Sequence, residues 1–553
     1  MTNTSIRTRA LACALLAGTA WCGLAAAPAA AQTPREHRTL DSNGVDLTHG
    51  DFVLAFVEGS IGSGDGELAL VRTRIGSGNG SWHVSSGGHQ WDGLFLTRSV
   101  GAAGTVISVN KDNRYELFSS SGTLPTGSSL TAVGAEHLYR SADGTLITFG
   151  DPTGSQSSSS THCNGSAGQG NCSQLPLSIS TPDGKSVGIS WEIWQSCSNE
   201  LIHVDNPALD CSYWARIASV SNSFGYRIAF AYASDGNFSS NGAPPPDSWQ
   251  RRTSAALYND VVSPTAAQAT IAYSYPSTSI VEVTDMGGRV WRFSSGGSRI
   301  TGIRRPGAQS DTKTISYGAG NDVSTVVSEG VTTQYSRSGN VMTVTQALPG
   351  EPDLVTTIVS DLTIGRPTSV TDPLSRTVAY EYDSGARLRK VTQPEGNFVQ
   401  YGYDSRGNVT ETRLRDKAGN SANDIVASAS YPATCANPAT CNSPDSVTDA
   451  RSHTTTFTYD PVHGGILTAT GPTPGAGAVP PRIRYRYDLV NGEHRLTGTS
   501  QCRTPASCEG TADEVKTSVA YDSNGNVQSA SSGDGTGALT ATTAMTYDPA
   551  GNL

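Results

Sequence analysis

The chain has few charged residues and no basic run. Charged residues make up 16% of its 553 residues, where about 25% is usual, and the formal net charge is −10. A protein that binds nucleic acid or anionic lipid through a charged surface concentrates lysine and arginine there. The sequence excludes such a surface, and we expect no nucleic-acid partner.

Signatures of common enzyme classes are also missing. The ten histidines are scattered without the spacing of a zinc-protease helix, and no Gly-x-Ser-x-Gly segment marks a hydrolase nucleophile. The pair Gly184-Lys185 lacks the glycine that a phosphate-binding loop carries five residues earlier, because that position is Ile179. We therefore expect no catalytic residue, no cofactor and no bound metal, in a protein that is not an enzyme.

Long hydrophobic runs are absent beyond the N-terminus. The single candidate covers residues 10–27, follows Arg7 and Arg9, and precedes small residues that end at Ala31. This order is typical of an export signal, and a retained anchor helix is the alternative. Removing residues 1–31 takes away two arginines and no acid, which leaves a net charge of −12. We expect a secreted, periplasmic or cell-surface protein without a membrane span.

Eight cysteines follow the expected signal, and they fall into close neighbours. In an exported protein such neighbours predict local disulfides. Metal binding is the rival interpretation because His162 adjoins Cys163, but no pair shows the two-residue spacing of zinc ligands. The predicted pairs are Cys163 with Cys172, Cys197 with Cys211, Cys435 with Cys441, and Cys502 with Cys508.

Glycine, in contrast, is abundant, at 60 residues or about 11% of the chain where ~7% is usual. Apolar and polar residues alternate between turn signals, as at residues 105–118 and 138–149, and no window after the signal shows sustained helical periodicity. We expect a nearly all-β protein. An N-terminal β domain would cover residues 32–153, and degenerate repeats with Ser/Gly-rich and Pro-rich loops would cover residues 154–270.

A sequence motif repeats in the second half of the chain. It starts with Val-Thr-Asp or a close variant, and it has one aromatic residue ten positions after the valine and another two positions later, usually followed by aspartate. Copies start at Val370, Val391 and Val447, with a looser copy at Val283. Recurrence of this kind predicts a repeat architecture, which we expect over residues 271–553. The residues assigned to the repeat are Tyr380, Tyr382, Asp383, Tyr401, Tyr403, Asp404, Gly407, Tyr459, Asp460, Tyr487, Asp488, Tyr521, Asp522, Gly525, Tyr547 and Asp548.

Each member of the motif has a structural role in a hairpin. Side chains two apart in a strand share a face, so Tyr380 and Tyr382 should point together and pack. Asp383 can cap the following turn, and Gly407 supplies the positive φ that such a turn needs. One hairpin cannot bury its aromatic face alone, so successive hairpins must join into one long sheet.

Two segments carry a family resemblance. Residues 365–388 read GRPTSVTDPLSRTVAYEYDSGARL and residues 403–409 read YDSRGNV. They resemble the RHS or YD repeats of bacterial RHS proteins and teneurins, specifically over about residues 271–553 and more weakly before them. The resemblance implies a spiral, solenoid-like antiparallel sheet of hairpins that forms a hollow shell. In that family the shell encloses a C-terminal toxin domain or serves cell-surface contact.

The sequence departs from the family pattern because it stops within a repeat, at residues 547–553, with no toxin or adhesion domain after it. We expect an N-terminal piece with a partial, open shell. The favoured function is a noncatalytic scaffold that encapsulates or presents a toxin or adhesion domain, with a cell-surface glycan or protein as a possible further partner. The alternative is an extracellular carbohydrate-binding protein or glycan-active enzyme that uses the N-terminal domain around Trp82, His83, His89 and Trp91.

Overall fold

A computed structural model gives the architecture. The ranges that it describes are residues 40–75, 94–101, 104–111, 114–118, 122–123, 128–134, 136–141, 143–150, 162–164, 171–203, 206–239, 245–297, 299–348, 350–475, 478–502 and 508–553. The expected signal at residues 1–31 lies outside them, and so does the segment of the alternative site with Trp82, His83, His89 and Trp91.

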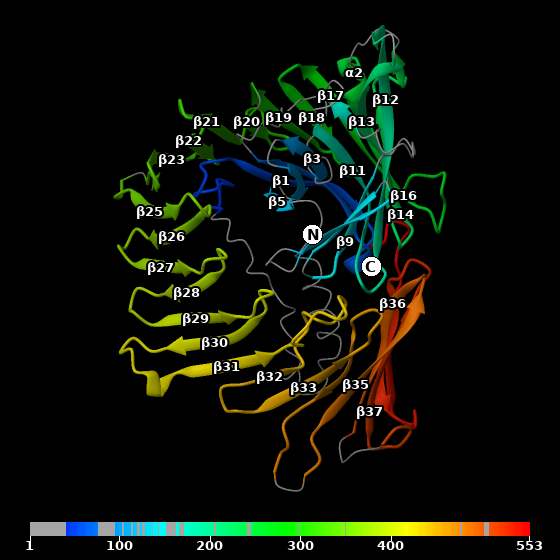
Figure 1. Ribbon diagram of the computed structural model, residues 1–553, viewed down its shortest axis with the longest axis vertical. Coiled ribbons are helices and arrows are strands. Elements are labelled where there is room, and N and C mark those ends of the chain that lie inside the picture. Colours follow the sequence, from blue (N-terminus) through cyan, green and yellow to red (C-terminus); the bar gives the residue numbers. More distant parts are fainter. Residues whose placement is uncertain are drawn as a thin grey trace.

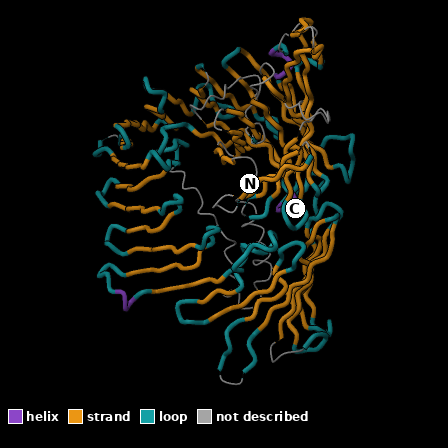
Figure 2. Tube along the Cα trace, in the orientation of Figure 1, coloured by secondary structure: helices purple, strands orange, loops and turns teal. Residues whose placement is uncertain are grey.

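Strands account for almost all regular structure, as the alternating pattern predicts (Figure 2). The short helical turns within the described ranges are η1 (Gly64–Gly66), α2 (Asp247–Gln250) and η2 (Ser421–Asn423). No helix in the described ranges is long and apolar enough to cross a membrane.

The first strands form a hairpin and the start of the main sheet. Among the described strands, β1 and β2 pair with each other alone, and β9 leads into the main sheet by pairing with β11. Their bounds are β1 (Val53–Ile61), β2 (Leu68–Ile75), β3 (Phe95–Gly101), β4 (Gly104–Lys111), β5 (Arg114–Phe118), β6 (Gly122–Thr123), β7 (Ser129–Val133), β8 (Glu136–Arg140), β9 (Leu146–Gly150), β10 (His162–Asn164) and β11 (Asn171–Ser180).

The next strands form the upper arc in Figure 1. Their bounds are β12 (Ser186–His203), β13 (Asn206–Asn222), β14 (Tyr226–Tyr232), β15 (Phe238–Ser239), β16 (Arg252–Asn259), β17 (Ala269–Ser277), β18 (Ile280–Thr284), β19 (Val290–Gly296), β20 (Arg299–Arg304), β21 (Lys313–Tyr317), β22 (Val323–Ser328), β23 (Val331–Ser338), β24 (Val341–Gln346) and β25 (Leu354–Asp361).

The last strands curve down one side of the molecule and back along its lower edge (Figure 1). Their bounds are β26 (Arg366–Thr371), β27 (Thr377–Tyr382), β28 (Leu388–Thr392), β29 (Phe398–Tyr403), β30 (Val409–Arg415), β31 (Ile425–Ser430), β32 (Ser446–Thr448), β33 (Thr454–Tyr459), β34 (Ile466–Thr470), β35 (Arg482–Val490), β36 (Glu493–Cys502), β37 (Glu514–Tyr521), β38 (Val527–Asp534) and β39 (Thr540–Ala544).

From β16 to β39 every strand pairs antiparallel with the next strand of the chain. The ladder crosses residue 270, where we expected the regular repeats to begin, without interruption. Its last strand, β39, pairs with β38 and with no other described strand. The sheet therefore curves through a spiral without closing into a barrel, which confirms the open antiparallel sheet expected from the sequence.

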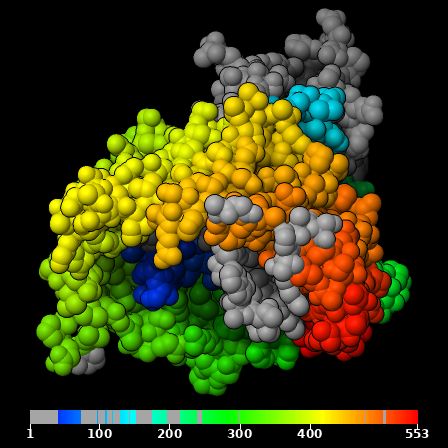
Figure 3. All heavy atoms as spheres, turned by 90° about the horizontal axis from the view of Figure 1, so that it is seen from below, coloured from blue at the N-terminus to red at the C-terminus, as the bar shows by residue number. Residues whose placement is uncertain are grey.

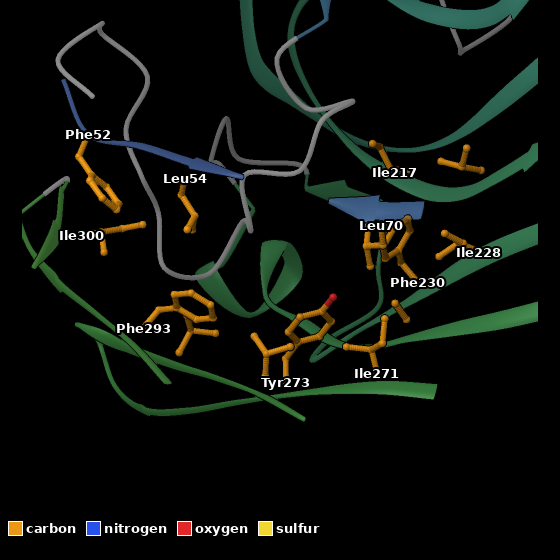
Figure 4. Close-up of a cluster of buried hydrophobic side chains, with 14 of the residues drawn as sticks. Phe52, Leu54, Leu70, Ile217, Ile228, Phe230, Ile271, Tyr273, Phe293 and Ile300 are labelled. Carbon is orange, nitrogen blue, oxygen red and sulfur yellow. The ribbon is translucent and has the colours of Figure 1, made fainter. Parts of the chain in front are cut away.

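The main core lies where the hairpin β1–β2 fills the inside of the upper arc. Phe52 and Leu70 are at most 3% exposed, and in Figure 4 Phe52 points toward Ile300 and Leu70 lies beside Phe230 of the sheet. At its centre the Arg72 guanidinium contacts the Glu58 carboxylate at 2.5 Å, and both side chains are fully buried. The hairpin side is thus the concave face of the sheet, and the N-terminal segment fills its first half.

A β-bulge recurs at one position of the hairpins and accounts for the curvature. The ladder shifts by one residue immediately before Tyr382, Tyr403 and Tyr459, and again before Tyr317 and Tyr521. A bulge bends its strand and increases the local twist. Repetition at the same place in successive hairpins turns a flat ladder into a spiral.

Candidate functional site: the repeat hairpins and their concave face

The second tyrosine of the repeats, with Tyr487 as an exception described below, ties its hairpin to an earlier strand. The Tyr403 hydroxyl donates a hydrogen bond to the carbonyl oxygen of Leu388 at 2.6 Å, and Tyr382 donates likewise to Pro367 at 2.8 Å. In both cases the acceptor lies fifteen residues earlier in the chain. We call this contact the tyrosine clamp. Further clamps are made by Tyr459 to Pro444, Tyr521 to Leu496 and Tyr547 to Val527.

The clamp extends into the early part of the chain. The Tyr232 hydroxyl donates to the Ile217 carbonyl at 2.6 Å, again over fifteen residues, in the segment that the sequence indicated as a degenerate repeat. Trp191 uses its indole N–H in the same way, donating to the Pro176 carbonyl at 2.8 Å over fifteen residues. The sequence interpretation missed Trp191 because tryptophan replaces the Tyr-Asp signal. Its fifteen-residue spacing to Pro176, which the clamps of Tyr382, Tyr403 and Tyr459 share, could have revealed it.

Burial raises the pKa of the clamp tyrosines. Burial is the main cause that raises the pKa of the Tyr403 hydroxyl to about 12, and the nearby Tyr401 and Asp383 raise it further. Burial raises the pKa of Tyr382 to about 12 as well. A neutral phenol is the hydrogen-bond donor that a backbone carbonyl requires, so both shifts favour the clamped form.

The aspartate after the clamp caps the turn. Oδ1 of Asp404 accepts hydrogen bonds from the backbone N–H groups of Arg406 and Asn408, both at 2.9 Å, while Gly407 has φ +91°. Burial alone would raise the pKa of the corresponding Asp383, but hydrogen bonds from the N–H and side chain of Arg387 lower it. The equivalent caps are Asp460, Asp522 and Asp548, and Gly525 has φ +73° in the turn after Asp522.

One repeat departs from this pattern. Tyr487 and Asp488 lie inside β35, which runs on to Val490. The Asp488 carboxylate therefore caps no turn and accepts a hydrogen bond from the Thr497 hydroxyl instead. The ring of Tyr487 packs against His463 at a centroid distance of 4.7 Å. A longer strand explains the difference, because the turn follows two residues later.

Ladder partners show which side chains of the repeats face inward. Directly paired residues project to the same face of an antiparallel sheet, and Ile358, a core residue, pairs with Val370, which pairs with Val378. Tyr380 shares a strand face with Val378, so the repeat aromatics lie on the concave face. By the same register the concave set continues through Val391, Val399, Tyr401, Thr412, Leu414, Ala427 and Phe457.

This second half of the concave face is apolar and only partly covered. Tyr380 and Tyr401 are half-buried, and Leu414 and Ile425 are 42% and 54% exposed. Within the described ranges, no concave side chain beyond Val370 belongs to or packs against a core cluster. Figure 3 shows the described N-terminal residues, in blue, between the yellow and the green parts of the sheet. The concave face of the sheet thus extends beyond the part that the β1–β2 hairpin covers.

The convex face of the same strands carries the charges. Lys390 lies 3.0 Å from Glu381, and Arg413 and Arg415 contact Asp424 at 2.6 and 2.7 Å. Successive residues of one strand therefore separate a charged outer surface from an aromatic inner surface.

Insertions between repeats carry disulfides. Cys435 is joined to Cys441, and Cys502 to Cys508. The first of these loops docks on a repeat turn, because Arg406 donates to the Pro432 carbonyl. The backbone positions of Cys163 and Cys172 are paired, as are those of Cys197 and Cys211, but their side chains lie outside the described set.

Among the described residues, no three His, Cys, Asp or Glu side chains come together as metal ligands. What the site offers is a curved inner surface of aromatic, aliphatic and hydroxyl side chains held by clamped hairpins.

The most regular hairpins of the chain match a known repeat family. The RHS Repeat family matches the sequence at residues 363–396 and 384–420, which cover β26 to β30. Residues 363–420 are therefore RHS repeats. Within these residues, Tyr382 and Tyr403 make the clamp, a bulge precedes each of them, and Asp383 and Asp404 cap the following turns. No curated protein matches the sequence.

Solved structures of toxin complexes also resemble the chain. One is TcdB2-TccC3 without its hypervariable C-terminal region, at 10% identity and a TM-score of 0.25, over 74% of this chain and 27% of that one. Another is the Photorhabdus luminescens Tc holotoxin pore, at 10% identity and a TM-score of 0.30, over 88% of this chain and 27% of that one. This chain spans about a quarter of the length of those chains. The family match, rather than these superpositions, identifies the repeats.

Proposed function

We propose that this RHS-repeat chain is an exported, noncatalytic scaffold whose concave face encloses or presents a polypeptide, such as a toxin or adhesion domain, in contact or competition between cells. The carrying observation is the division of the concave face. Its first half is filled by the β1–β2 hairpin of the chain itself, and its second half exposes aromatic and aliphatic side chains of the same sheet. An exposed apolar surface of this kind marks an interaction site.

The opposite faces of β28 supply the test. Val391 lies on the concave face, and its neighbour Lys390 lies on the convex face beside Glu381. An unfolded reporter polypeptide with trypsin sites would be joined after Leu553 and, in a second protein, inserted in the exposed turn at Leu374. We expect the reporter after Leu553 to be digested more slowly than the one at Leu374.

Face-specific variants complete the experiment. Val391→Glu should remove the protection of the reporter, because it places a charge on the apolar face. Lys390→Glu should keep the protection, since it changes charge only on the outer surface. Equal digestion at the two fusion positions, or equal effects of the two variants, would refute the proposal.

A further inference from the structure

The two ends of the spiral meet through their turns rather than through a strand pair. Two turns of the upper arc take part: the turn between β13 and β14, at Phe224, and the turn after β16, at Asn259. Both contact Asn524 in the turn between β37 and β38. The residues after β39 contact the loop between β1 and β2, where the Gly62 N–H donates to the Ala550 carbonyl at 2.8 Å. We call this set of contacts the seam.

Amide side chains form the middle of the seam. Asn259 and Asn524 exchange hydrogen bonds, with Nδ2 to Oδ1 distances of 3.1 and 2.9 Å, and they are 1% and 6% exposed. Asn524 also donates to the Phe224 carbonyl at 2.8 Å. Beside them, Asn526 Nδ2 donates to the Tyr226 hydroxyl at 3.3 Å. These bonds join residues that are 265 to 300 positions apart in the chain.

Charged groups form the outer part of the seam. Asp65 lies 3.1 Å from Lys185 and 3.8 Å from Arg495, and Arg495 lies 3.6 Å from the buried carboxylate of Glu493. The Ser223 hydroxyl donates to Glu493 across the seam. Arg495 donates through Nη2 to the Gly525 carbonyl, whereas its Nη1 has acidic groups nearby but no hydrogen-bond acceptor, so water could hydrate it when the ends part.

The seam and the ladder therefore differ in how they resist opening. Parting the seam exchanges protein–protein for protein–water hydrogen bonds, which nearly balance, and uncovers only the parts of Phe224 and Tyr226 that lie against Gly525 and Gly551. Parting the ladder exposes backbone groups together with the aromatic side chains packed on them. Close approach at the seam also depends on glycine, because a Cβ on Gly525 would lie 2.8 Å from the Phe224 ring.

We propose that the seam is a reversible clasp. The turns carrying Glu493, Asn524 and Ala550 separate as one unit from those carrying Asp65, Phe224 and Asn259, while the ladder stays paired and acts as the hinge. Opening the clasp widens the shell without unfolding it. The inference concerns this chain alone and does not depend on what the concave face holds.

Distances between spin labels test the clasp directly. Val262 and Leu489 flank the seam on its two sides and are 56% and 66% exposed, so labels there disturb no packing. Keto-bearing amino acids at both positions accept the label without involving cysteine. In pulsed EPR of the full chain, we expect a short distance at neutral pH and a second, longer distance in Asn259→Ala/Asn524→Ala. A control substitution of an exposed turn residue away from the seam, Leu374→Ala, should leave the distribution unchanged.

The unsubstituted seam provides an independent readout. In urea concentrations below the unfolding transition, the long-distance population of the labelled chain should grow at least threefold while far-UV circular dichroism stays constant. If the short distance persists until circular dichroism is lost, or if the double variant keeps the short distance alone, the clasp does not exist.

Discussion

Removing one hydroxyl from the clamp should loosen one hairpin and leave the rest of the spiral intact. In Tyr403→Phe the Leu388 carbonyl loses the hydrogen bond that it now receives at 2.6 Å, and Leu388 is 6% exposed. Leaving a buried acceptor unpaired costs about 1–3 kcal/mol. Taking about 1.4 kcal/mol, the amides of β28 and β29 should exchange hydrogen roughly tenfold faster.

The matched control is in the same strand. Among the described residues, the Tyr401 hydroxyl makes no hydrogen bond, although its ring lies on the same face two positions away. Tyr401→Phe should therefore change exchange by less than about threefold, since a surface change is usually within ~0.5 kcal/mol. Hydrogen exchange followed by mass spectrometry resolves the peptides concerned. Equal effects of the two variants would refute the clamp. So would faster exchange spread to β36–β38, because the described ladder pairs β28 with β27 and β29, and β29 with β28 and β30.

Three further outcomes are expected. Between pH 10 and pH 12 the free energy of unfolding should fall, because the unfolded chain loses tyrosine protons near pH 10 whereas folded Tyr382 and Tyr403 keep theirs to about pH 12. Equal free energies of unfolding at the two ends of this range, measured in urea, would contradict this. Glu58→Ala should lower the free energy of unfolding by about 3–5 kcal/mol, since it leaves the buried Arg72 without its carboxylate. Glu381→Ala on the convex face should lower it by less than ~1 kcal/mol. Similar melting temperatures for the two variants in thermal unfolding would be inconsistent with the buried pair. Cys435→Ser should speed amide hydrogen exchange in its own loop, because the disulfide there restricts the unfolded chain by about 2 kcal/mol. Amide exchange in β29 and β30 should not change. Faster exchange in those strands would show that the loop supports the ladder.

The repeat hairpins were predictable because their signals are local. Aspartate and glycine set each turn within five residues, and the strands that follow these turns start at Leu388, Val409 and Val527. The face of the tyrosines followed from strand alternation alone. The carbonyl that each clamp tyrosine reaches did not, because the acceptor is set by the register between strands, which depends on the bulge.

Other features depend on contacts that no local pattern encodes. The place of the β1–β2 hairpin inside the arc follows from packing of residues such as Leu70 and Ile271, which are some 200 positions apart. The seam joins Asn259 to Asn524, and asparagine in a turn is ordinarily explained by the turn itself. The length of β35 separated Asp488 from its turn although its Tyr-Asp signal is intact.

Photocrosslinking from the two faces of β28 tests the central claim most directly. Benzophenone would replace Val391 on the concave face or Lys390 on the convex face, in the protein that carries the reporter after Leu553. The scaffold account predicts crosslinks from position 391 to the reporter and few or none from position 390. Crosslinks of equal yield from both positions, or none from position 391, would contradict it.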